Sequence, residues 1–242
     1  MLEGRKVCVL AVELVEEVGS RNHKSVVGCW IEGSGGGASK GRNVTYMAFS
    51  TLRGDVTNVA AELELATRKF GALGSTRTAI SVALTGPNQG SKTVTTMWES
   101  SDACFDARKA VMNDPEVVAG MQAAGNVPVQ LGFSEVKAEL GNCEGTYACA
   151  AVAIASDHSD EAVAGVVAQS ERVIMPHGIN GYRMVRMVAA GEQTGAYVNL
   201  FYCDSVDAYF AGSAAAWADA GFVAQSQKIG AQIVDRLISR MV

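Results

Sequence analysis

Residues 191–210 read GEQTGAYVNLFYCDSVDAYF, and residues 86–105 read GPNQGSKTVTTMWESSDACF. Each stretch has two glycines around a short turn, then an apolar strand, then a polar cap before a helix. The matched positions are Gly86 with Gly191, Gly90 with Gly195, Ser100 with Ser205, Asp102 with Asp207, Phe105 with Phe210, Asp114 with Asp219 and Gly125 with Gly230. A period of about a hundred residues is too long for a solenoid unit, so each copy should be a small domain.

The second copy, residues 145–242, predicts strands and helices in the order βαββαβ. The expected elements are a strand at 146–156, a helix at 157–175, strands at 182–190 and 195–203, a helix at 206–230 and a strand at 231–242. Asp157 or Ser159 should cap the first of these helices, because a side-chain oxygen satisfies the free N–H groups of a helix start. Pro176 and Gly178 should end it.

The first copy, residues 45–140, predicts the same order. The expected elements are a strand at 44–52, a helix at 55–70, strands at 76–84 and 91–99, a helix at 102–125 and a strand at 127–136. Asp55 is the expected cap of the first helix, and Pro115 should break or bend the second. An element order of βαββαβ is typical of the ferredoxin-like split βαβ unit, an α+β fold whose helices cover one face of an antiparallel sheet.

One copy leaves the second face of its sheet uncovered. Two tandem copies cover each other when they pack sheet to sheet within one chain, which predicts an intrachain dimeric α/β barrel. Residues 1–44 belong to neither copy and predict an N-terminal extension or hairpin arm. This arm would extend a sheet edge or reach a neighbouring subunit, so we expect a homo-oligomer.

The composition excludes several classes of function. A net charge of -5, with scattered basic residues, is against nucleic-acid binding. The sequence has no apolar run long enough for a membrane helix, and the acidic residues near the N-terminus are untypical of a signal peptide, which predicts a cytoplasmic protein. The six cysteines form no C-x-x-C pair and the three histidines are scattered, so neither a disulfide framework nor a metal site is expected.

The hairpins that end in WESSDACF and YCDSVDAYF resemble those of the dimeric α/β-barrel superfamily, in particular antibiotic-biosynthesis-monooxygenase-like and Nipsnap-like domains. The Asp114-Pro115-Glu116 break resembles theirs as well. The resemblance covers residues 45–242. It implies the fold more firmly than the function, since the superfamily includes cofactor-independent oxygenases, haem-binding enzymes, isomerases and proteins without known activity.

The resemblance places a ligand pocket between the sheet and the helices of the second copy. Strand alternation predicts that Tyr197, Asn199 and Phe201 point to that side. Asn199 is a polar amide within an aromatic strand, where it would orient a substrate carbonyl or dioxygen, or else bond to a neighbouring side chain. The matching position of the first copy is Val94, which predicts a drier pocket there.

Further candidates are His177, two arginines and Trp98. His177 would act as general base or haem ligand, or simply cap the C-terminal end of a helix. Arg183 and Arg186 lie on opposite faces of one strand, so one of them would clamp a substrate carboxylate, unless both form ion pairs at the rim. Trp98 would form a wall of the substrate pocket or part of the core.

Three functions follow from these candidates. The first is a cofactor-independent, monooxygenase-like enzyme for a hydrophobic or aromatic small molecule, with His177 and Asn199 as catalytic groups. The second is a binding or assembly protein without catalytic activity, because no general acid–base pair is visible. The third is a haem-binding protein that uses His177 as the iron ligand.

Overall fold

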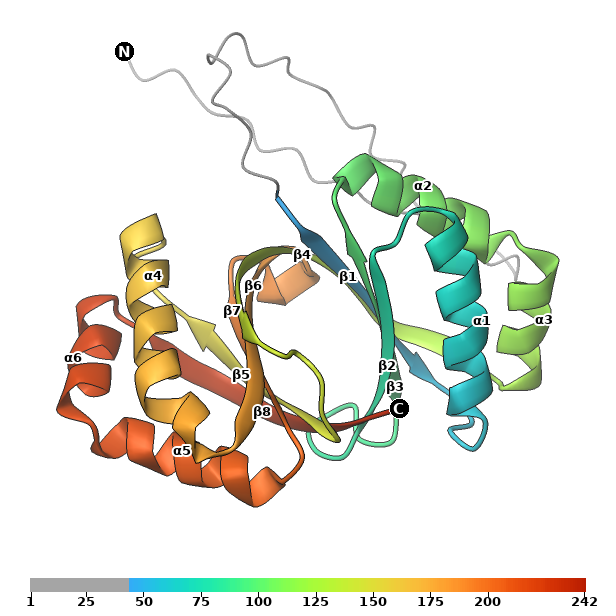
Figure 1. Cartoon of the computed structure of the whole chain (residues 1–242). Helices are drawn as coiled ribbons and strands as arrows, with labels where there is room; N and C mark the ends of the chain where they lie inside the picture. Colours follow the sequence, from blue (N-terminus) through green and yellow to red (C-terminus); the bar gives the residue numbers. More distant parts are fainter. Residues whose placement is uncertain (1–43) are drawn as a thin grey trace, which may run out of the picture. The chain divides into compact units, whose positions relative to one another are not determined.

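Eight antiparallel strands close into a barrel in the computed structural model of the chain, which describes residues 44–242 (Figure 1). We call residues 45–140 the first half and residues 145–242 the second half. The strands of the first half are β1 (Tyr46–Arg53), β2 (Arg77–Ala83), β3 (Lys92–Trp98) and β4 (Val127–Gly141). Those of the second half are β5 (Tyr147–Ile154), β6 (Ile179–Ala189), β7 (Tyr197–Cys203) and β8 (Gln232–Met241).

The two halves have matching strand orders, β4-β1-β3-β2 and β8-β5-β7-β6. Two seams join them into the closed barrel. Strands β4 and β6 pair over most of the length of β6, whereas β2 and β8 pair through only Ser81–Met241, Val82–Arg240 and Ala83–Ser239. The predicted α+β class is confirmed: the described residues form one eight-stranded antiparallel sheet and six α-helices.

The helices lie outside the barrel, three on each half (Figure 1). They are α1 (Val59–Ala72), α2 (Ser101–Met112) and α3 (Pro115–Ala123) in the first half, and α4 (Asp160–Gln169), α5 (Val206–Ala218) and α6 (Ala220–Lys228) in the second. Strand alternation therefore gives every strand a helix-facing side and a barrel-facing side. On β7, Tyr197 and Phe201 pack in the helix-side core, while Val198 packs in the core inside the barrel.

Two predicted helices differ from the observed ones. The helix expected at 206–230 is interrupted at Asp219, whose carboxylate accepts the N–H of Phe222 at 2.8 Å and so caps a new helix, α6. This is the same break that Asp114 and Pro115 introduce in the first half. The cap expected at Asp55 is also wrong, because Asp55 bonds to Thr57 in a preceding turn and α1 begins only at Val59.

The helix that starts the second half changes type along its length. Ser159 caps α4, as expected, by accepting the N–H of Ala162 at 3.1 Å. A π-helical segment, Ser170–Ile174, and a short 3-10 segment, Met175–His177, then follow. Gly178 ends them with a φ of 86°, a left-handed conformation that favours glycine. The prediction that Gly178 ends the helical structure is confirmed.

Almost all of the predicted N-terminal arm lies outside the described residues, which begin at Val44. The boundary between two domains at residues 140–145 stays a prediction. None of the helices in residues 44–242 is long and apolar enough to cross a membrane.

Candidate ligand-binding site

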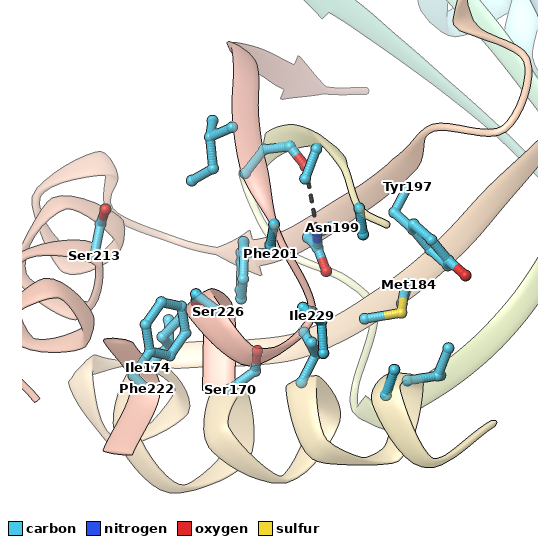
Figure 2. Close-up of a pocket in the computed structure, with 18 of the residues that line it drawn as sticks. Ser170, Ile174, Met184, Tyr197, Asn199, Phe201, Ser213, Phe222, Ser226 and Ile229 are labelled. Atoms are coloured by element: carbon cyan, nitrogen blue, oxygen red, sulfur yellow. Dashed lines mark hydrogen bonds between the residues drawn. The ribbon is translucent and has the colours of Figure 1, made fainter. Parts of the chain in front are cut away.

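A cavity of about 100 Å³ lies between the sheet of the second half and its helices (Figure 2). Its floor includes Ala151, Ala153 and Ala155, whose short side chains leave the space open, and its walls come from α4, α5 and α6. We call it the helix-side cavity. The predicted pocket residues Tyr197, Asn199 and Phe201 all line it. A mainly apolar cavity with a few placed polar groups is typical of a small-molecule site.

Asn199 is the central polar group of the helix-side cavity. Its Oδ1 accepts a hydrogen bond of 2.6 Å from the Tyr182 hydroxyl. Its Nδ2 donates to the Ala151 carbonyl at a long 3.4 Å, the bond that is dashed in Figure 2. Because the Ala151 carbonyl can only accept, its bond fixes which end of the amide is the donor. Only one of the two N–H groups on Nδ2 has a partner among the described residues, so a donor remains for a ligand.

The Tyr182 hydroxyl lies near both Asn199 and the π-helical segment. Tyr182 is completely buried, and Ser170, the first residue of that segment, is close enough to lower the pKa of its phenol slightly. Burial raises the pKa of Tyr182 far above its ordinary value, so the phenol stays protonated and donates. The hydrogen bond from Tyr182 therefore helps to hold the amide of Asn199 in one orientation. Sequence reasoning missed Ser170 and Tyr182, although a π-helical segment often marks a functional site.

Tyr197 forms one end of the cavity, beside Met184, with its hydroxyl pointing away from Asn199 (Figure 2). This hydroxyl is buried and has no hydrogen-bond partner within residues 44–242. The exposed His158 ring stacks on the Tyr197 ring, with centroids 5.7 Å apart. Burial raises the pKa of Tyr197, and the charge of Arg186 partly opposes this. An unpaired buried hydroxyl is costly, so water or a ligand would complete its hydrogen bonding.

The other end of the cavity opens toward solvent. Arg236 of β8 is exposed and donates to the Ser213 hydroxyl at 3.1 Å. Trp217, which is 47% exposed, packs edge-on against Phe222 beside it. Sequence reasoning also missed Arg236. Strand alternation places Arg236 and Ile238 on the same side of β8, and this signal could have identified Arg236. The comparison of the two halves gave no signal, because the matching residue of β4 is the apolar Leu131.

The remaining predicted site residues do not gather at this cavity. Arg183 lies inside the barrel, on the opposite side of the sheet, and is only 3% exposed. Arg186 is half-buried and close enough to Tyr197 to lower its pKa. His177 is exposed at the end of its 3-10 segment and does not line the cavity. Trp98 is fully buried in the core of the first half, where its Nε1 donates to Thr96 at 2.9 Å.

The closed eight-stranded barrel with external helices is also found in solved structures of other proteins. The fold is similar to that of an anthrone oxidase-like protein, with a TM-score of 0.53 and 14% sequence identity, over 83% of this chain and 92% of that one. It is also similar to that of a mutant chlorite dismutase from Candidatus Nitrospira defluvii, with a TM-score of 0.50 and 10% identity, over 82% of this chain and 91% of that one.

No protein-family model matches the chain, and no curated protein matches its sequence. At identities of 14% and 10%, similarity to solved structures shows the fold alone. The function has to be argued from the side chains of the site. The described residues contain no group of three or more His, Cys, Asp or Glu side chains placed to hold a metal ion.

Proposed function

We propose that this protein binds a compact, apolar or aromatic molecule in the helix-side cavity and oxidises it with dioxygen, without a cofactor. The observation that carries the proposal is the amide of Asn199, which Tyr182 holds in one orientation within an apolar cavity. A pre-oriented N–H donor stabilises negative charge that develops on a substrate oxygen. The similarity of the fold to an anthrone oxidase-like protein supports this class of chemistry.

The proposed substrate has a methylene group activated by a neighbouring carbonyl. Asn199 Nδ2 would donate to that carbonyl oxygen as the methylene loses its first proton and becomes an enolate. Asp157 is the carboxylate that lines the cavity, and this position makes it our candidate proton acceptor. Its hydrogen bonds to Ser159 lower its pKa, which keeps it ionised but makes it a weaker base. Dioxygen then takes the electrons: one oxygen atom becomes a new carbonyl, and the other leaves as water with both methylene hydrogens.

Oxygen uptake with a panel of aromatic ketones that carry an activated methylene tests the proposal. Asn199→Val copies the first-half residue Val94, and it should abolish uptake while the protein remains folded by circular dichroism. Thr95→Val, in a separate cavity inside the barrel, is the matched control and should keep full uptake. Uptake that survives in Asn199→Val, or no uptake with any member of the panel, would contradict the oxidase proposal.

A binding protein without turnover is the second candidate. One observation favours it: both ends of the Asn199 amide already bond to the protein, as they would in a structural role. Saturable binding of the same ketones without oxygen uptake, with the Asn199→Val variant binding equally well, would select this candidate.

Haem with His177 as iron ligand does not fit this site. The lining residues of the helix-side cavity include no histidine or cysteine, and His177 is exposed outside it. Iron held by this histidine would therefore lie away from the cavity.

We further propose that the two halves are tandem ferredoxin-like repeats, a reading supported by their matching strand orders. We also propose that the protein is related to Nipsnap-like domains, that it is cytoplasmic and that it forms a homo-oligomer. Gel filtration with light scattering would test the oligomeric state: a monomeric mass would contradict it.

A further inference from the structure

The barrel interior contains a second cavity, of about 230 Å³, on the opposite side of the sheet from the helix-side cavity. It is large enough for several water molecules or one compact organic molecule. We propose that this interior cavity is a separate binding site for a small aromatic carboxylate with a polar ring substituent. The proposal rests on other residues than the proposed oxidase function does, so each can fail without the other.

Hydroxyl groups of the first half line one wall of the interior cavity. Thr51, Thr93 and Ser81 lie in register across β1, β3 and β2, and the first two are hydrogen-bonded to each other at 3.0 Å. Thr95 lies two residues further along β3 and faces the same way. Ser81 and Thr95 line the cavity, and neither hydroxyl bonds to another of the described residues. These two groups are free to hydrogen-bond to a polar substituent of a ligand.

The second half contributes a mainly apolar wall, in which Asp235 of β8 is the one carboxylate among the described residues that line it. At the positions that match Thr51, Thr93 and Thr95 it has Val152, Val198 and Leu200. These side chains pack in a common core with Met47, Phe49 and Met97. A flat ligand would thus meet hydroxyls on one side and apolar groups on the other. An aromatic ring with a polar substituent fits this division.

Two arginines give the interior cavity a positive end. Arg183 donates to the Tyr202 hydroxyl at 2.9 Å and to Glu139, and Arg77 donates to the carbonyl of Cys143 at 2.6 Å. Both arginines line the cavity. Their carboxylate partners lie further out: the Arg183 side chain is 4% exposed against 42% for Glu139, and Arg77 is 33% exposed against 67% for Glu144.

This arrangement leaves the inner side of both ion pairs positive. A guanidinium group presents several N–H donors in one plane, which suits a carboxylate. Neutral amides lie across the other end of the barrel. Asn88 donates to Gln130 at 3.3 Å and Gln130 donates to Gln193 at 3.0 Å. The cavity is therefore polarised along the barrel, and the carboxylate of the ligand should lie at the arginine end.

Calorimetric titration of the full chain with 4-hydroxybenzoate tests this site, with 4-hydroxybenzamide as the uncharged counterpart. We expect saturable binding of the benzoate and at least tenfold weaker binding of the amide. Arg77→Gln should weaken the benzoate at least tenfold, because charge-assisted hydrogen bonds are lost. Thr95→Val keeps the shape of the side chain and should weaken binding about threefold to tenfold, since it removes one hydroxyl.

Ala151→Leu narrows the helix-side cavity and is the matched control, which should bind 4-hydroxybenzoate like the unmodified chain. The proposal would be overturned by an absence of saturable binding, by equal binding of acid and amide, or by unchanged affinity in Thr95→Val. Loss of binding in Ala151→Leu would also overturn it, because it would place the ligand in the helix-side cavity. If Arg77→Gln does not fold, Thr95→Val and the amide still decide the question.

Discussion

Lys92 in the first half and Tyr197 in the second half occupy matching positions, each the first residue of a hairpin's second strand. Lys92 is fully buried and donates to Glu62 and, at 2.6 Å, to the carbonyl of Asp55. Tyr197 is also buried, but its hydroxyl has no partner among the described residues. The first half therefore has an ion pair at this position, whereas the second half has a tyrosine hydroxyl that lacks a hydrogen-bond partner among the described residues.

The same contrast extends into the helices. Arg108 of α2 donates to Ser50 at 3.0 Å, and burial lowers the pKa of its guanidinium. Its counterpart on α5 is the small Ser213, which lines the helix-side cavity. In the first half, charged side chains occupy the space between sheet and helices. In the second half, small residues leave that space open, as the proposed binding function requires.

The largest effect should follow from breaking the ion pair of the first half. Lys92→Met removes the cation and leaves Glu62 without it, which should lower the free energy of unfolding by about 3 kcal/mol. Urea unfolding at neutral pH measures this. The double variant Lys92→Met with Glu62→Leu should recover most of the loss. A single variant as stable as the original chain would show that the pair contributes little.

A smaller loss of stability is expected when the hydrogen bond between Tyr182 and Asn199 in the second half is removed. Tyr182→Phe removes the donor to Asn199 and should lower the free energy of unfolding by about 1 to 3 kcal/mol, because a partly buried amide oxygen is left unpaired. Tyr197→Phe is the matched control, since it removes a hydroxyl without a partner, and should cost nothing measurable. Equal losses of stability in the two variants would contradict the stabilising role of the Tyr182–Asn199 hydrogen bond.

The helix break at Asp219 predicts a pH-dependent effect. Arg172 and the N–H of Phe222 lower the pKa of Asp219 to about 2, from an ordinary value of 3.8. The charged carboxylate therefore stabilises the fold fully above that ordinary value, and its contribution is lost as the pH falls through about 2. Asp219→Asn should lower the Tm at pH 6, with the difference shrinking toward pH 2.

Asp114→Asn makes the corresponding test in the first half, where Lys69 lowers the pKa of Asp114. It should show the same sign and the same pH trend. A Tm difference for either variant that grows as the pH falls would contradict the assigned roles.

The smallest effect concerns the thiols. Cys104, Cys143, Cys149 and Cys203 are buried, and burial raises the pKa of Cys149 to about 12 and that of Cys104 to about 11. These four should remain unmodified by iodoacetamide in the native protein at pH 8 and react in urea. Peptide mapping by mass spectrometry measures this. Rapid native labelling of Cys149 would mean that the second half opens more readily than its packing indicates.

The elements of the fold could be predicted well from the sequence. All eight strands lie within or close to their expected ranges, although β4 continues to Gly141 instead of ending near 136. The break at Asp219 could also have been predicted, because Asp219 matches Asp114 in the two similar stretches of sequence. However, the helical spacing of apolar residues continues across the break, and this spacing predicted a single helix.

The candidate site could be predicted only in part. Strand alternation placed Tyr197, Asn199 and Phe201 on the side of the helices, because its period of two depends on the backbone alone. His177 and Trp98 were predicted from their residue types, but His177 is exposed and Trp98 is fully buried in the core of the first half. No local pattern reports such distances.

The sequence by itself determined the α+β class and the two faces of each strand, since periodicity is a local property. Only the tertiary structure decided which side chains those faces contact. Closure of the barrel placed Arg183 and Arg77 at one interior cavity, and the packing of α4 brought Ser170 to Tyr182. These contacts depend on strand register and helix packing between residues far apart in the chain, which local side-chain chemistry does not specify.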